Sequence, residues 1–288
     1  MTNTVEIRGE DDLQRELAAM ATSRRMVFFA GLPGVGKSLF IRELAKAAHV
    51  AGRPVHLLQW DVVRPAFVTP EIDARYPEVG NVTHAMIRKA VGQWSRGAVR
   101  RWHLEHDASH ILIGEVPLIG YRLLDLVQCK EDDAEPLLAG PVVLFATPVP
   151  SAAVREVIEN ARGRTFANPA HPRERADAPP ELMRRAWQEL RAHAVSIGAA
   201  PAAGAEGNAA YDPQTYAAVY GHLLRHRHAL TLQMNVQLAH RTSVYELGAH
   251  ARELVPREGE AAVIVSQIEQ ACSPAALEQD VADWFGKV

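Results

Sequence analysis

The chain reads Gly31-Leu32-Pro33-Gly34-Val35-Gly36-Lys37-Ser38 between an apolar run and a stretch of helical periodicity. Three glycines let the backbone turn tightly enough for its N–H groups to converge on an anion, and the positive end of the following helix strengthens that attraction. The lysine reaches the β- and γ-phosphates of a nucleotide, and the serine hydroxyl ligates Mg²⁺. The spacing therefore predicts a loop that binds ATP with Mg²⁺. The residues expected to contact the nucleotide are Gly31, Leu32, Pro33, Gly34, Val35, Gly36, Lys37, Ser38 and Leu39.

Both flanks of the loop have the pattern that such a loop requires. Residues 26–30 form a short, continuous apolar run, which is typical of a strand buried on both faces. After the lysine, apolar residues recur at helical spacing, namely Leu39, Phe40, Leu44, Ala47 and Ala48. The sequence therefore predicts a strand, a phosphate-binding loop and a helix in succession.

Length and composition limit the class of protein. The 288 residues are 48% hydrophobic and 23% charged, enough to bury a sizeable core. Two cysteines, Cys129 and Cys272, are too few for a disulfide framework. The first fourteen residues are polar and acidic, and no apolar run reaches the ~20 residues of a membrane span. We expect a cytoplasmic protein with no membrane partner.

Positive charge is concentrated in two stretches, although the net charge is −3. Residues 79–104 contain five basic residues and no acid, and residues 162–175 contain four arginines against Glu174. Such stretches suit a positive cleft for phosphates or a nucleic-acid backbone. A solvated helix face and an exposed loop explain them equally well.

Strand-like and helical segments alternate along the chain. This alternation predicts an α/β fold with a parallel sheet, helices on both faces and a helical insertion. We expect a core with a lid over 1–194, an insertion over 195–241 that is all-helical from 213 to 239, and a last strand with C-terminal helices over 242–288. The expected strands are 26–30, 55–60, 111–113, 142–146 and 244–247; the expected helices are 11–21, 83–102, 121–130, 151–161, 181–194, 259–271 and 275–285.

Acidic residues follow two of the predicted strands. Asp61 comes directly after the second strand and Glu115 after the third. Because ligands of open parallel sheets bind at the carboxyl ends of the strands, we expect both carboxylates to face the triphosphate. A kinase needs such a pair, one acid to accept the proton of the acceptor hydroxyl and another to hold Mg²⁺ or the acceptor.

A resemblance to a known family follows from these positions. Asp61-Val62-Val63-Arg64 resembles the D-x-x-R pattern of P-loop kinases of the polynucleotide-kinase and zeta-toxin kind. The resemblance implies that Asp61 is the general base and that Arg64 helps to hold the acceptor. It covers roughly residues 26–170, and the stretch 195–241 has no counterpart in it. Arg155, Arg162 and Arg164 resemble the lid arginines that close over the transferring phosphate in this superfamily.

The predicted function is therefore an ATP-dependent kinase that phosphorylates a hydroxyl of a nucleoside, nucleotide or nucleic acid, including a 5′-hydroxyl or a hydroxymethylated base. Ser38 and Glu115 are the expected Mg²⁺ ligands. The catalytic residues expected are Lys37, Asp61, Arg64, Glu115, Arg162 and Arg164. Arg122 either reaches the acceptor or forms a surface ion pair. The alternatives are a small-molecule kinase for a sugar or antibiotic and a P-loop switch ATPase without an acceptor. A third is a binding module whose binding of a partner is controlled by the nucleotide.

One cluster of polar residues suggests a metal. His103, Glu105, His106, Asp107 and His110 lie close together in the sequence. Their spacing matches no zinc-ligand pattern with a fixed second half. We interpret them as solvated residues of the turn between a helix and a strand.

Overall fold

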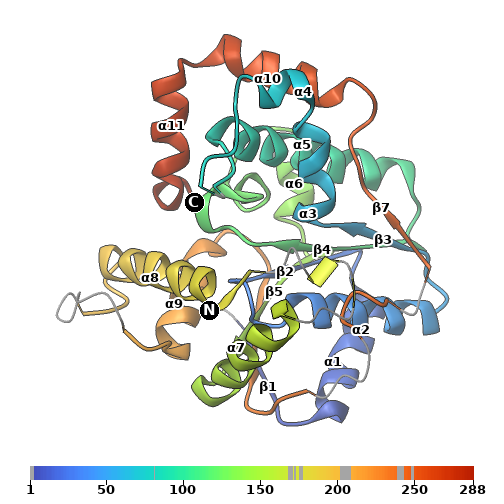
Figure 1. Cartoon of the computed structure of the whole chain (residues 1–288). Helices are drawn as coiled ribbons and strands as arrows, with labels where there is room; N and C mark the ends of the chain where they lie inside the picture. Colours follow the sequence, from blue (N-terminus) through green and yellow to red (C-terminus); the bar gives the residue numbers. More distant parts are fainter. Residues whose placement is uncertain are drawn as a thin grey trace.

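The computed structural model describes residues 3–80, 82–167, 171, 173–174, 178–201, 209–238, 243–247 and 250–288, and for 163–167 and 287 it describes the backbone alone. Within these residues, seven parallel strands form one sheet in the order β1-β6-β5-β2-β4-β3-β7 (Figure 1). The strands are β1 (Asn3–Ile7), β2 (Met26–Ala30), β3 (Val55–Leu58), β4 (Ile111–Val116), β5 (Val143–Pro150), β6 (Ala229–Met234) and β7 (Ala251–Glu253).

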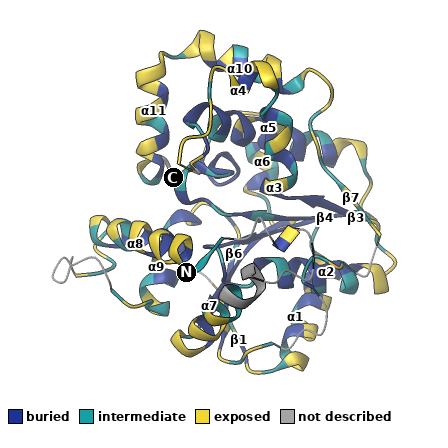
Figure 2. Cartoon of the chain, viewed as in Figure 1, coloured by how far each residue is buried: buried dark blue, intermediate teal, exposed yellow. Residues whose placement is uncertain are grey.

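Helices cover both faces of the sheet. Alternate residues of β2 point to opposite faces, so that Val27 and Phe29 belong to one core cluster with residues of α1 (Glu10–Ser23) and α2 (Lys37–Val50), whereas Met26 and Phe28 belong to another with residues of α5 (Ala85–Glu105). Figure 2 shows the central strands buried and the outer faces of α8 and α11 exposed. The helices are α1 (Glu10–Ser23), α2 (Lys37–Val50), α3 (Trp60–Val63), α4 (Pro70–Asp73), α5 (Ala85–Glu105), α6 (Glu135–Leu138), α7 (Ala152–Ala167), α8 (Pro180–Ser196), α9 (Pro213–Leu223), α10 (Glu260–Ala271) and α11 (Pro274–Ala282).

Most expected elements are confirmed within a few residues of their predicted ends. The strands at 26–30, 55–60, 111–113 and 142–146 are β2 to β5, and the helix starting after Ser151 is α7. Ser151 caps α7, because its hydroxyl accepts a hydrogen bond from the Val154 N–H at 3.3 Å. None of the described helices is both long enough and apolar enough to cross a bilayer.

The expected helix at 121–130 is wrong. The chain forms two short 3₁₀ turns there, Ile119–Tyr121 and Leu124–Leu126. Leu118, Tyr121 and Leu123 have positive φ angles of 65°, 68° and 59°, which interrupt any helical run. All three side chains are fully buried, so packing of this segment overrides its helical periodicity.

The expectation that residues 213–239 are all helical is also wrong. Among the described residues 213–238, only α9 is helical, and β6 lies inside the sheet between β1 and β5. In β6, the buried Leu230, Leu232 and Met234 alternate with other residues at the strand period, a signal that the helical interpretation missed. The stretch 195–241 is therefore not a purely helical insertion.

The two edge strands differ from the sequence-based expectation as well. The strand expected at 244–247 is absent from that described segment, and β7 forms at 251–253 beside β3 instead. At the other edge, β1 pairs in parallel with β6, although the polar N-terminal residues predicted no strand. Both edges are exposed and short of apolar residues, which leaves little periodic signal in the sequence.

Gly114 provides a test of how tightly the centre of the sheet is packed. A Cβ at this residue would lie 2.8 Å from both the Leu58 carbonyl oxygen and the Phe28 ring. Because the carbonyl belongs to the neighbouring strand and cannot move aside, Gly114→Ala should destabilise the fold by about 2–3 kcal/mol. Urea unfolding measures this change.

The matched control is Gly97→Ala on the exposed side of α5, where a Cβ meets no atom within 4 Å. That variant should be stabilised by about 0.5–1 kcal/mol, because alanine favours the helix interior. Equal effects of the two substitutions would contradict the packing described for β4.

Candidate functional site

The glycine-rich loop lies at the point where the order of the sheet reverses. After β2 the chain builds β3 and β4 on one side, and then crosses to build β5 and β6 on the other. Ligands of open α/β sheets bind outside the carboxyl ends of the strands at such a switch point. The loop that follows β2 and ends at the start of α2 occupies this position.

The loop has the backbone conformation that its glycines allow. Gly34 and Gly36 have φ angles of 75° and 96°, in the left-handed region that disfavours other residues. At the first turn of α2, the buried Lys37 folds back over the loop. Its Nζ donates hydrogen bonds to the carbonyl oxygens of Gly31 and Leu32, each at 2.9 Å. The ammonium group is therefore held at the centre of the loop.

Three helices that come later in the chain contact this loop. The Tyr216 hydroxyl of α9 accepts a hydrogen bond from the Leu32 N–H at 3.3 Å. Met183 of α8 lies against Gly34. Arg155 of α7 donates from Nη1 to the Pro33 carbonyl at 2.8 Å, while its buried Nη2 has no hydrogen-bond partner among the described residues. Sequence reasoning missed Met183 and Tyr216, since no local motif marks a residue that reaches the loop from a distant helix.

Both predicted carboxylates lie in the electrostatic neighbourhood of Lys37. Burial lowers the pKa of Lys37 to about 8, and the negative charges of Glu115 and Asp61 act in the opposite direction. Burial raises the pKa of Glu115, whereas Lys37 lowers it and Asp61 raises it further. Asp61 stands in the first turn of α3, directly after β3. The structure thus brings together Lys37, Asp61 and Glu115 as predicted.

Ser38 has a partner that the sequence did not suggest. Its side chain is hydrogen-bonded to Tyr245, whose pKa is raised by burial and, more weakly, by the charges of Glu115 and Asp61. Tyr245 belongs to the segment that we expected to be a strand, and no motif in the sequence marks it as a site residue. The predicted Mg²⁺ ligands Ser38 and Glu115 therefore share one polar neighbourhood with this phenol.

The predicted arginines divide into different environments. Arg162 is half-buried and acts electrostatically on both Lys37 and Tyr245, and burial lowers its own pKa. Arg64 instead forms an ion pair with Glu78, an exposed glutamate, at 3.3 Å. The side chain of Arg164 lies outside the described residues. Among the described side chains, the structure therefore places Arg162 and Arg155 close to Lys37.

Arg122 is close enough to Asp61 to be influenced by its charge, and it forms no ion pair among the described residues. Burial lowers its pKa, and among the charges that oppose this shift Asp61 acts most strongly. Its guanidinium lies 6.0 Å from the centre of the Trp60 ring, and its buried Nε has no partner in the described part of the chain. Arg122 therefore offers a buried N–H group at the same end of the sheet as the acids.

Acids neutralise most of the first basic stretch, residues 79–104. Lys89 pairs with Asp280 at 2.7 Å, and Arg96 pairs with Asp132 and Glu135, each at 2.5 Å. Arg100 pairs with Asp133, and Arg101 pairs with Glu260. Arg88 donates to the Gly120 carbonyl, and its buried Nε has no hydrogen-bond partner among the described residues. These contacts tie α5 to its neighbours. Of the two interpretations of this stretch, the positive cleft is therefore weakened, because acids neutralise four of its five charges.

Comparisons with known proteins give no family for this chain. No protein-family profile matches it, and a search of curated proteins finds no match. What the site can do is therefore argued from its own groups. A glycine-rich loop with a buried lysine suits an anion, and a hydroxyl with a carboxylate suits a hard cation such as Mg²⁺.

The lowered pKa of Lys37 predicts a pH dependence of stability. The folded state holds this proton less tightly than the unfolded state. The destabilising effect of the charged Lys37 is therefore complete below pH 8, and it decreases as the pH rises toward 10.5. From pH 7 to 10 the free energy of unfolding of the wild type should rise by about 2 kcal/mol relative to that of Lys37→Met. Urea unfolding across this range measures the difference.

The control for this experiment is Lys46→Met on the same helix. Lys46 is half-exposed and pairs with Glu43 at 3.0 Å, so this variant removes a lysine that water still solvates and controls for the loss of a lysine from α2. A flat difference for Lys37→Met would show that the lysine is not desolvated.

Proposed function

We propose that this protein is an ATP-dependent kinase that transfers a phosphoryl group to a hydroxyl of a nucleoside, nucleotide or nucleic acid. The observation that carries the proposal is the position of Lys37, which is buried at the glycine-rich loop with Asp61 and Glu115 in its electrostatic neighbourhood. A loop of this composition at the switch point of a parallel sheet suits a triphosphate. The two acids add what phosphoryl transfer to a hydroxyl needs.

The groups around the loop fit ATP with Mg²⁺. Lys37 is a desolvated cation whose donors turn back to carbonyl groups of its own loop, and a phosphate would replace those weak acceptors with charged ones. The unpartnered Nη2 of Arg155 is a second buried donor beside the loop. Ser38 and Glu115 offer the oxygen ligands that Mg²⁺ prefers. When bound, MgATP supplies the phosphoryl group and neutralises part of the charge that develops during its transfer.

In this proposal Asp61 accepts the proton of the acceptor hydroxyl. In the sheet, β4 lies between the loop strand β2 and β3, and Asp61 follows β3 at its carboxyl end. An acceptor that approaches the terminal phosphate from this side would meet the carboxylate. Arg122, on which Asp61 acts electrostatically, would hold the acceptor in position. Arg64, whose described partner is Glu78, reaches the acceptor only after that ion pair opens.

The lid role falls to arginines of α7. Arg162 and Arg155 both act on Lys37, and both bring positive charge to the site from the segment after β5. Positive charge that is fixed before the reaction stabilises the transferring phosphoryl group without reorganisation. Arg164 remains a candidate from the same helix.

The proposed acceptor class is supported by a donor that lacks a partner. Arg122, on which Asp61 acts electrostatically, has a buried Nε–H without a hydrogen-bond partner in the described residues. Phosphate oxygens satisfy guanidinium donors well, so an acceptor that itself carries phosphate fits better than a neutral sugar. This favours a nucleotide or an oligonucleotide within the proposed class.

The proposal predicts the effect of removing the base. Asp61→Asn should lower kcat by about 10²–10⁴ because a positioned carboxylate no longer accepts the proton, while the Kd for MgATP changes little. The measurement is transfer of labelled γ-phosphate to nucleosides, nucleotides, 5′-hydroxyl and hydroxymethyl-base oligonucleotides, sugars and aminoglycosides. Lys37→Ala should weaken nucleotide binding as well as transfer.

Asp73→Asn is the matched control, since this exposed aspartate lies on α4 away from the loop. Its kinetics should equal those of the wild type. Transfer to sugars or aminoglycosides alone would replace the acceptor class with the small-molecule alternative. ATP hydrolysis without transfer to any acceptor, and insensitive to Asp61→Asn, would contradict the kinase and support a switch ATPase.

Arg162 gives a second kinetic prediction. Arg162→Ala should lower kcat by about 10²-fold or more, because an arginine that stabilises the transferring group acts mainly on the transition state. Arg162→Lys should recover only part of the rate, since an ammonium cannot make the paired contacts of a guanidinium. Steady-state kinetics with MgATP test this, and an unchanged kcat in Arg162→Ala would remove Arg162 from the lid.

A further inference from the structure

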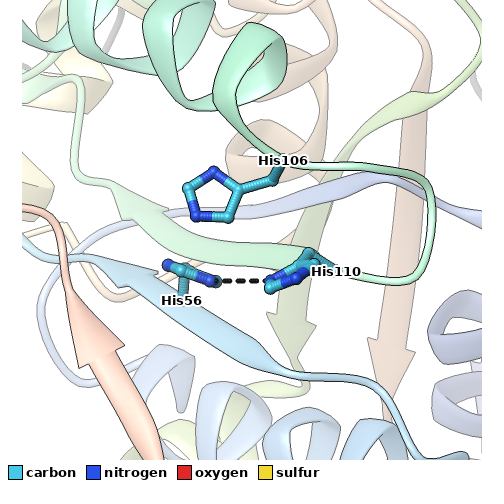
Figure 3. Close-up of side chains that lie close together, drawn as sticks. All are labelled: His56, His106 and His110. Carbon is cyan, nitrogen blue, oxygen red and sulfur yellow. Dashed lines mark hydrogen bonds between the residues drawn. The ribbon is translucent and has the colours of Figure 1, made fainter.

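Three histidines meet at the other end of the sheet from the loop. His56 is the second residue of β3, His106 follows the last residue of α5, and His110 directly precedes β4 (Figure 3). Their ligand nitrogens all lie within 4.8 Å of one another. The turn from α5 to β4, which we interpreted as solvated, therefore faces a histidine that lies 50 residues earlier in the sequence. No local spacing could have revealed this third residue.

The distance between two of these nitrogens is close to that of a metal site. His56 Nε2 and His110 Nδ1 are 3.0 Å apart. In a tetrahedral zinc site with Zn–N bonds of 2.0–2.1 Å, ligand nitrogens are about 3.3 Å apart. The first pair thus needs to open by only a few tenths of an ångström. The ring of His106 lies above the other two in Figure 3, with one nitrogen facing them and the other facing away.

The outward nitrogen of His106 is held by a backbone acceptor. His106 Nδ1 lies 2.9 Å from the Trp102 carbonyl oxygen, and the two rings stack with centroids 5.2 Å apart. A proton on Nδ1 that is donated to this carbonyl leaves the lone pair of Nε2 directed at the other histidines. Metal-binding histidines are commonly oriented by a hydrogen bond of this kind.

The turn that carries His106 and His110 is fixed by two arginines. Arg25 donates to the carbonyl oxygens of Asp107, His110 and His106. Arg53 donates to the His110 carbonyl at 2.6 Å and to those of Ser109 and Ala108. These bonds hold the turn in one conformation, so that two of the three imidazoles are placed before any ion binds.

The donor set selects the class of metal. All three ligands are imidazole nitrogens, which suit zinc, copper, iron or nickel, whereas Mg²⁺ and Ca²⁺ prefer oxygen ligands. Arg25, which holds the same turn, brings positive charge close to the histidines. A bound cation would therefore have to be held by coordinate bonds, which favours a transition metal over Mg²⁺ or Ca²⁺.

We propose that His56, His106 and His110 form a binding site for a transition-metal ion of the zinc type. Three imidazole ligands leave one coordination position for water or a fourth ligand, as in open zinc sites. The bound ion would link the start of β3 to the turn before β4. This site is separate from the proposed Mg²⁺ site, where the ligands are oxygen atoms, and does not depend on the proposed kinase activity.

The test is zinc binding to the full chain after treatment with a chelator. The wild type should retain about one equivalent of Zn²⁺ after dialysis, measured by metal analysis. Co²⁺ in its place should give the strong visible absorption of a four-coordinate site. His106→Gln and His110→Gln, both at half-buried positions, should each weaken zinc binding at least tenfold.

Two control variants make the result specific. His49→Gln, at an exposed position on α2, should bind zinc as the wild type does, and so should Lys37→Ala. Far-UV circular dichroism checks that each variant is folded, and the half-buried variants keep the test valid should His56→Gln fail to fold. The proposal is overturned if the wild type retains no zinc, or if His106→Gln and His110→Gln bind it as tightly as His49→Gln.

Discussion

The buried ammonium group of Lys37 is the constraint on which the site depends. A lysine that is only 8% exposed carries a desolvation penalty, which is why burial lowers its pKa to about 8. Its described hydrogen-bond partners are two neutral carbonyl groups, and Glu115 and Asp61 compensate the charge only in part. Such an arrangement is destabilising in itself and is explained if an anion completes it, as proteins keep strained or desolvated groups where they bind ligands.

The fold holds this lysine at the point where the order of the sheet reverses. Two apolar layers hold β2 between β4 and β5, so the loop after β2 cannot shift along the sheet. Residues from α7, α8 and α9 then reach the loop from the far part of the chain, through Arg155, Met183 and Tyr216. The carboxyl end of the sheet thus gathers anion-binding and acidic groups, whereas the amino end gathers the three histidines, and the two sets share no residue.

The sequence predicted those features that depend on local pattern. The loop, its flanking strand and helix, and the strand-end positions of Asp61 and Glu115 follow from apolar runs and glycine spacing, and the structure brings Lys37 and both acids together. Features set by distant packing could not be predicted in this way. The left-handed residues Leu118, Tyr121 and Leu123 replace an expected helix because their side chains fill the core, and β6 appears where helical propensity suggested otherwise. Tyr245, Tyr216 and His56 reach their partners only through the tertiary fold.

Proton uptake on nucleotide binding tests the central claim most directly. A bound triphosphate should raise the lowered pKa of Lys37, so at pH 8.5 MgATP binding should take up about 0.7 proton, calculated for a pKa of about 8 in the free protein. Isothermal titration calorimetry in buffers of different ionisation enthalpy measures this number, with Lys37→Ala as the reference. The account predicts uptake in the wild type that disappears in the variant. MgATP binding without proton uptake, or no binding at all, would contradict a buried lysine that is completed by the triphosphate.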